Sequence, residues 1–136
     1  MDQIRELNKK TIEQFREHRG GGPLRGRPLL LLTTRGRKSG RPYTTPVMYR
    51  PDGDRLLVFA SCMGAPSHPD WYLNLVADPK VTVEVGAETY EATAVVVTGE
   101  ERERLWAVTK EQYPFFTEHE ARTEREIPVI ALERLP

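Results

Sequence analysis

The chain has 136 residues, with 20 Lys and Arg against 20 Asp and Glu, so its formal net charge is zero. This length predicts a single domain with one core, and a content of 38% hydrophobic and 29% charged residues excludes disordered and membrane-embedded chains. No apolar run, residues 29–32 included, is long enough to span a bilayer, and the single cysteine allows no internal disulfide, so we expect a soluble cytoplasmic protein.

Residues 2–18 are predicted to form an amphipathic helix. Leu7, Ile12 and Phe15 recur at helical spacing among charged residues. The charges argue against a signal peptide, and the glutamates among them argue against a helix that lies on a membrane. We therefore expect this helix to pack on its own domain and do not expect membrane association.

A glycine-rich loop follows the helix, with three glycines at 20–22 and a proline directly after them. The loop divides the chain into residues 1–22, the helix and its loop, and residues 23–136, a single cofactor-binding domain.

The second part of the chain reads as six strands with few helices. We expect strands over residues 28–34, 41–50, 55–61, 81–85, 88–98 and 128–132. Helices are predicted over 70–77 and from Thr98 to the residue before Pro114. Tight turns between consecutive strands favour antiparallel pairing, and six strands favour a closed or nearly closed barrel. The predicted fold class is mainly β with flanking helices (α+β).

A basic turn at residues 35–41 is the first candidate site, because four cations and two glycines fall within seven residues. Glycines let backbone N–H groups point at an anion, and Arg and Lys add charge-assisted hydrogen bonds. The first 50 residues hold 12 Lys and Arg against 4 acids, whereas residues 51–136 hold 8 against 16. The spacing of a P-loop is absent, and the pI of about 6.8 argues against nucleic acid. A solvated hairpin tip is the alternative.

The second candidate is the loop over residues 60–69 with the helix that follows it. Its small residues let a flat ring approach the backbone closely, and Trp71 could wall a pocket or simply belong to the core. His68 has no partner at metal-ligand spacing, so no metal is predicted. Cys62 has no evident base, so thiol catalysis is not expected.

The third candidate is the aromatic segment at residues 113–119, which contains three aromatic residues and a histidine. The segment could line the mouth of a substrate pocket, or it could plug the core.

In this order the motifs resemble those of the F420H2-dependent quinone reductase family, also described as deazaflavin-dependent nitroreductases. The resemblance covers about residues 12–133. Its marks are Gly-Pro-Leu-Arg-Gly at 22–26, Leu-Leu-Thr-Thr-Arg-Gly-Arg-Lys-Ser-Gly-Arg-Pro at 31–42, Pro-Asp-Gly-Asp at 51–54, Gly-Ala-Pro-Ser-His-Pro-Asp-Trp-Tyr-Leu-Asn-Leu at 64–75, Gln-Tyr-Pro at 112–114 and Arg-Glu-Ile-Pro-Val at 125–129.

The resemblance implies a split β-barrel related to FMN-binding oxidoreductases, with coenzyme F420 as the cofactor and FAD or FMN as alternatives. It implies hydride transfer to a small-molecule acceptor: a quinone, a nitro-aromatic or an activated alkene. A non-catalytic carrier of a flavin-type cofactor or another anionic ligand is the alternative function, and a homodimer is a possible assembly.

The resemblance also implies a site, with the anionic tail of the cofactor at the basic turn and the ring against the second candidate loop. The expected cofactor-binding residues are Arg37, Lys38, Ser39, Arg41, Tyr43, Thr45, Pro46, Ala60, Ser61, Cys62, Gly64, Ala65, Asp70 and Trp71. The expected acceptor-binding residues are Met48, Tyr113, Phe116 and His119. Ser61 is the expected catalytic residue, because its hydroxyl could stabilise charge on the acceptor oxygen. Tyr43 and Cys62 stand where members commonly have Arg and Lys.

Overall fold

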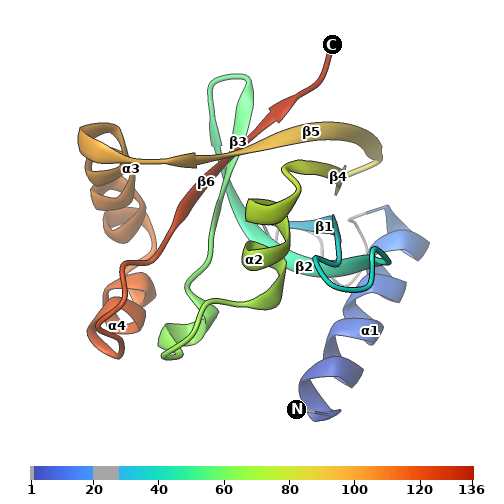
Figure 1. Cartoon of the computed structure of the whole chain (residues 1–136), viewed down its shortest axis with the longest axis horizontal. Coiled ribbons are helices and arrows are strands. Elements are labelled where there is room, and N and C mark those ends of the chain that lie inside the picture. The colour runs from blue at the N-terminus through green and yellow to red at the C-terminus, as the bar shows by residue number, and fades with distance from the viewer. Residues whose placement is uncertain (1, 20–27) are drawn as a thin grey trace.

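The structure is a computed structural model that describes residues 2–19 and 28–136 (Figure 1). The expected glycine-rich loop, the division of the chain at residue 22 and the motif at 22–26 all fall on the segment 20–27, outside the described residues.

Six antiparallel strands form one closed barrel, in the order β1-β2-β3-β6-β5-β4. The strands are β1 (Leu29–Arg35), β2 (Pro42–Asp52), β3 (Arg55–Phe59), β4 (Lys80–Val85), β5 (Glu88–Val97) and β6 (Val129–Arg134). The helical elements are α1 (Asp2–His18), the short 3-10 helix η2 (Cys62–Gly64), α2 (Asp70–Ala77), α3 (Gly99–Gln112) and α4 (Phe115–Ala121). The mainly β fold with flanking helices is confirmed.

Two apolar clusters make up most of the core. One combines residues from all six strands with helix α2, and includes Leu30, Val83 and Trp71. The other joins β3 and β6 to the helices α3 and α4 through Phe59, Trp106 and Phe116, among others. The second cluster therefore fixes the helical end of the molecule to the barrel.

Helix α1 packs on the barrel through its C-terminal half. Phe15 is 3% exposed and contacts Leu31 of β1, while Arg16 forms an ion pair with Glu84 of β4 at 3.0 Å. The expected packing of this helix on its own domain is confirmed. Leu7, however, is 64% exposed, so its half of the expected apolar stripe is not buried. Among the described residues, no helix is long and apolar enough to cross a membrane.

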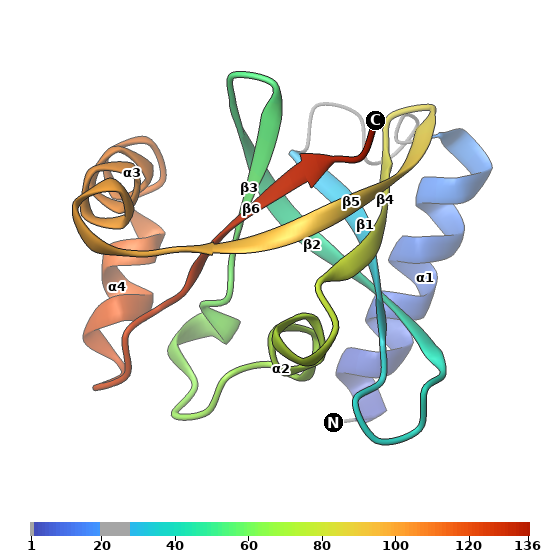
Figure 2. The same ribbon diagram turned by 45° about the horizontal axis from the view of Figure 1, so that its top comes forward.

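Two helical elements occupy segments that were expected to be irregular, η2 and α4. The third strand also ends at Phe59, two residues earlier than expected. Figures 1 and 2 place α4, η2, α2 and the β1–β2 turn along the same edge of the barrel. All three candidate sites therefore lie along that edge.

Candidate active site

The β1–β2 turn is a closed backbone loop that depends on Gly36. The N–H of Gly40 donates to the carbonyl of Gly36, and the N–H of Gly36 to that of Arg41, both at 2.8 Å. A Cβ atom on Gly36 would lie 2.6 Å from the Tyr43 ring and 2.7 Å from the Ser39 hydroxyl, so any larger residue would displace these two side chains. The Ser39 and Tyr43 hydroxyls in turn lie within hydrogen-bond distance of each other, at 3.1 Å.

Arg37 ties this turn to helix α2. Its backbone N–H and its Nη1 both donate to Asn74 Oδ1, at 3.2 and 2.8 Å, and its Nη2 lies 3.4 Å from an Asp70 carboxylate oxygen. Asn74 is 4% exposed and also donates to the Thr34 hydroxyl. Arg37 therefore acts largely as a brace. In the described part of the chain, the exposed side chains of Lys38 and Arg41 form no ion pair, which leaves them available to an anion.

A hollow of about 350 Å³ opens between the turn and α2. It is lined by Gly36, Arg37, Lys38, Ser39, Tyr43, Asp70 and Asn74. Through Tyr43 and Asp70 it adjoins a second hollow of about 820 Å³ between α1 and β2, which Thr45 also lines. Five of the expected cofactor-binding residues thus surround one hollow, and a sixth lines the next.

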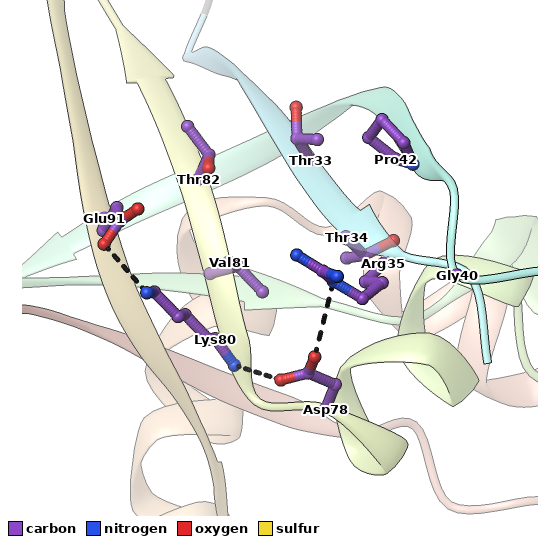
Figure 3. Close-up of a pocket in the computed structure, with 10 residues that line it drawn as sticks. All are labelled: Thr33, Thr34, Arg35, Gly40, Pro42, Asp78, Lys80, Val81, Thr82 and Glu91. Carbon is purple, nitrogen blue, oxygen red and sulfur yellow. Dashed lines mark hydrogen bonds and ion pairs between the residues drawn. The ribbon is translucent and has the colours of Figure 1, made fainter.

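A third hollow, on the other side of the same turn, has a different charge pattern (Figure 3). Its two cations face carboxylates, with Arg35 3.8 Å from Asp78 and Lys80 3.3 Å from Glu91. Because a carboxylate lies beside each of its two cations, this hollow carries little net positive charge and is a poorer match for an anionic ligand than the one beside Lys38.

Farther along the edge, Ser61 and His119 lie together, although 58 residues separate them in the chain. Ser61 Oγ is 3.3 Å from His119 Nδ1, and Ser61 is 7% exposed. Burial lowers the pKa of His119, and the charge of Arg122 lowers it further against the opposing effect of Glu118. The imidazole is therefore neutral at pH 7, and its Nδ1 and the serine hydroxyl can share a hydrogen bond.

The backbone after Ser61 is left-handed at three successive residues, with φ of 46° at Cys62, 54° at Met63 and 79° at Gly64. Such angles cost a non-glycine residue about 1–2 kcal/mol. A Cβ on the buried Gly64 would lie 2.5 Å from the backbone oxygen of His119. This close contact between η2 and α4 is what brings Ser61 to His119.

The remaining expected site residues differ in exposure. Ala60 is fully buried, Trp71 is 9% exposed and Phe116 is 3% exposed, so all three belong to the two core clusters. Met48 and Tyr113 are partly buried against the same cluster as Phe116. Cys62 is exposed. Pro46 lies on β2 opposite Leu31, and Ala65 follows η2.

Two residues that organise this edge were not predicted from the sequence, Asn74 and Arg125. The guanidinium of Arg125 donates to the backbone oxygens of Ala60, Ser61 and Ala65. Both residues lie inside the motifs at 64–75 and 125–129, but their partners are distant in sequence, so only the motifs themselves signalled them.

The model of the F420H2-dependent quinone reductase family matches residues 6–134. The chain belongs to this family. An F420H2-dependent quinone reductase of Mycobacterium tuberculosis is 41% identical over 110 residues, which cover 79% of this chain and 74% of that protein. The reductase activity and the F420 cofactor expected from the sequence are those of the family.

Solved structures agree with this assignment. An F420-H2 dependent reductase (FDR-A) is 40% identical with a TM-score of 0.71, covering 79% of this chain and 95% of its own. A domain-swapped dimer is 38% identical with a TM-score of 0.74, covering 97% of this chain and 98% of its own. HutZ, the heme storage protein of Vibrio cholerae, is 18% identical with a TM-score of 0.61 over 91% of this chain and 89% of its own, and shares the fold alone. The expected split β-barrel is confirmed.

The residues present suit coenzyme F420, whose phosphate and glutamate tail is anionic and whose deazaflavin ring is flat. Lys38, Arg41 and the Ser39 hydroxyl offer unpaired positive charge and a donor at the turn. The absence of a Cβ at Gly36 keeps the turn compact beside the hollow. The chemistry of this donor set therefore matches the tail of the cofactor.

Proposed function

We propose that the protein reduces a quinone with reduced F420, holding the cofactor tail at the β1–β2 turn and the acceptor near Ser61. The observation that carries the proposal is the basic turn fixed to α2 by Arg37 and Asn74, with Lys38 and Arg41 left free. The cofactor-binding and acceptor-binding residues expected from the sequence are part of this proposal.

Each part of the site has a separate task. When bound, reduced F420 supplies a hydride. The turn holds the anionic tail by charge-assisted hydrogen bonds, and the segment that begins at Ser61 fixes the position of the acceptor. The Ser61 hydroxyl donates to the acceptor oxygen as negative charge grows there. His119 Nδ1, 3.3 Å from Ser61 Oγ, helps to fix the orientation of that hydroxyl, and solvent supplies the proton that the reduced acceptor takes up.

The deciding experiment mixes the purified protein anaerobically with reduced F420 and menadione, and follows the return of the visible absorbance of the oxidised cofactor. We expect catalytic turnover that requires both components. Binding of F420 without turnover would favour the alternative, a non-catalytic carrier. Spectral titrations with F420, FMN and FAD test the cofactor, because tighter binding of FMN or FAD would contradict the proposal.

In this proposal, the acceptors include nitro-aromatics and activated alkenes as well as quinones. All three classes are flat, and negative charge builds up on each of them as the hydride arrives. Aromatic residues at the acceptor end favour flat molecules through stacking, at roughly 0.5–1.5 kcal/mol per pair. A panel of quinones, nitro-aromatics and enones under the same assay ranks the three classes.

The proposed assembly is a homodimer in the cytoplasm. Its support is the domain-swapped dimer that is 38% identical to this chain. The single thiol, Cys62, is also exposed, which suits a reducing compartment. Light scattering coupled to size exclusion measures the mass directly, and a monomer at micromolar concentration would contradict the dimer.

The Lys38→Ala variant is expected to bind F420 about tenfold more weakly or worse, since a hydrogen bond to a charged group contributes roughly 1.5–3 kcal/mol. Its melting temperature should not change, because the side chain is exposed on a turn. Fluorescence titration measures the affinity. Arg104→Ala, which removes an exposed cation on α3, is the matched control. Equal affinity in both variants would rule out the assigned tail site.

The unfolding free energy should fall as the pH drops below about 6.5, the ordinary pKa of histidine. The pKa values of His68 and His119 are lowered in the folded protein, mainly by burial. The unfolded chain therefore takes up protons first, and stability is lost until the pH passes the folded pKa values. Urea unfolding between pH 7.5 and 5 measures the slope, and His119→Gln should flatten it. An unchanged slope in that variant would contradict the prediction.

A further inference from the structure

We propose that Arg125 is a positioning residue. It holds the Ser61 end of the site in its reactive conformation and in a fixed position relative to helix α2. The inference rests on the proposed function, because it concerns the same site. Arg125 lies after α4, on the segment that leads into β6. His119 and Arg122 of the preceding stretch also contact the segment 60–68, but Arg125 makes the most hydrogen bonds to it.

The side-chain hydrogen bonds of Arg125 all reach the segment 60–68. Its Nη2 donates to the Ser61 carbonyl at 2.7 Å, and its Nη1 to the Ala60 carbonyl at 3.0 Å. Its Nε donates to the Ala65 carbonyl at 2.9 Å. These three carbonyls lie on both sides of the left-handed residues Cys62 and Met63. Conformations of this kind persist only where the surroundings fix them, and the planar guanidinium supplies three fixed points.

A fourth contact extends the brace to helix α2. Arg125 Nη1 lies 3.1 Å from His68 Nδ1, and the His68 ring packs against the Tyr72 ring of α2 with 4.7 Å between the centroids. Burial and the charge of Arg125 lower the pKa of His68, so its Nδ1 is free to accept. Helix α2 also carries Asn74 and Asp70, which hold the basic turn. Arg125 thus connects the acceptor end to the tail end.

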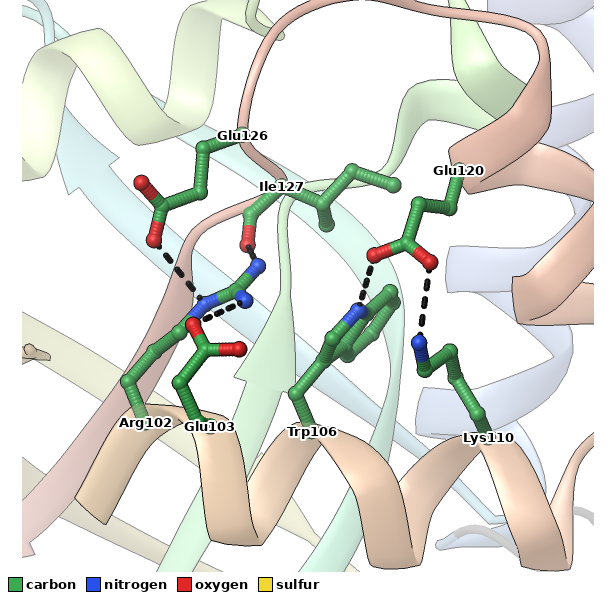
Figure 4. A network of polar contacts seen from close by, with 7 residues as sticks. All are labelled: Arg102, Glu103, Trp106, Lys110, Glu120, Glu126 and Ile127. Atoms are coloured by element: carbon green, nitrogen blue, oxygen red, sulfur yellow. Dashed lines mark hydrogen bonds and ion pairs between the residues drawn. The ribbon is translucent and has the colours of Figure 1, made fainter. Parts of the chain in front are cut away.

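The segment that carries Arg125 is itself held from helix α3 (Figure 4). Arg102 is 5% exposed, donates to the Ile127 carbonyl at 2.6 Å and lies 3.2 Å from Glu126. Trp106 and Lys110 both donate to the Glu120 carboxylate of α4. The base of the Arg125 side chain is therefore fixed on one side and its guanidinium on the other. A side chain fixed at both ends in this way holds the segment 60–68 in place relative to α3, whereas a surface ion pair would not.

The test uses Arg125→Lys, which keeps the charge and loses the planar fork, with Arg104→Lys at an exposed position of α3 as the matched control. Cys62 is the only cysteine, so its rate of reaction with a disulfide reagent reports the conformation of the braced segment without any cofactor. We expect Arg125→Lys to raise that rate at least threefold. With reduced F420 and menadione, kcat should fall at least tenfold, while the Kd for F420 changes less than threefold.

A second variant, His68→Ala, and the melting temperature test the same role independently. His68→Ala removes one of the four contacts and should shift the thiol rate in the same direction by a smaller factor, which keeps the test open if Arg125→Lys does not fold. A lower melting temperature with unchanged thiol rate and unchanged kcat would overturn the inference and leave Arg125 as a purely structural residue. Failure of the wild-type protein to reduce menadione would instead overturn the proposed function, and the thiol rates would still decide whether Arg125 braces the segment.

Discussion

The Phe116→Ala variant is expected to lose about 3–5 kcal/mol of unfolding free energy, the cost of removing a buried phenylalanine. Phe116 is 3% exposed and packs against four rings, with centroids 5.3 Å from Phe59, 5.5 Å from Trp106, 4.5 Å from Phe115 and 5.7 Å from His119. For a chain of this size, the melting temperature should fall by about 10 °C or more. Urea unfolding and thermal melts measure both quantities.

Tyr113→Phe is the matched variant, because Tyr113 is only partly buried against the same cluster and the change removes a hydroxyl without a cavity. If both residues also contact the acceptor, Tyr113→Phe should leave stability intact and raise the KM for a quinone. If Tyr113→Phe leaves both KM and kcat for the quinone unchanged, the role of this aromatic segment is packing alone. A Phe116→Ala variant as stable as the wild type would contradict the packing seen here.

The Gly64→Ala variant is expected to lose about 3 kcal/mol of unfolding free energy. The left-handed backbone, with a φ of 79°, costs alanine about 1–2 kcal/mol. The new Cβ would also lie 2.5 Å from the His119 oxygen and 2.7 Å from the Arg122 Cβ, and such overpacking adds typically 1–3 kcal/mol. Because η2 must then move away from α4, the contact between Ser61 and His119 should break, and turnover should fall along with stability.

Gly86→Ala is the control for this prediction. Gly86 also has a positive φ, of 57°, but a Cβ there would meet nothing within 4 Å. It should therefore lose only the backbone cost of about 1–2 kcal/mol and keep full activity. The difference between the two variants measures how tightly η2 packs on α4. Equal losses in both would contradict the close contact at Gly64.

The parts of the fold that depend on local chemistry were predictable from the sequence. Helix α2 begins and ends where expected, since Asp78 and Pro79 stop it. The turn at Gly53 has the positive φ that Asp-Gly favours. The sequence does not predict helix α4, because Pro114 marks the end of the preceding helix, whereas in the structure it is also the N-terminal cap of the next one. A seven-residue helix owes its stability to tertiary contacts such as those of Phe116, which no local pattern reveals.

The candidate site, too, was predictable from the sequence only where its residues are adjacent in the chain. The basic turn was recognisable because its cations and glycines are adjacent in sequence. The role of Asn74 was not, because it depends on Arg37, 37 residues away. Arg125 likewise acts on carbonyl groups about 60 residues distant, and a carbonyl acceptor leaves no mark in the sequence.

The closed order of the strands limits how two copies of this chain can associate. Each of the six strands has a hydrogen-bonded neighbour on both sides. An unpaired strand edge is the usual template on which a second chain adds itself, whether in a dimer or in an aggregate. No strand of the barrel is unpaired along a whole side, and only short stretches such as residues 42–48 of β2 pair on one side alone. Two copies must therefore meet mainly through side chains on the outer surface, or by exchanging an element.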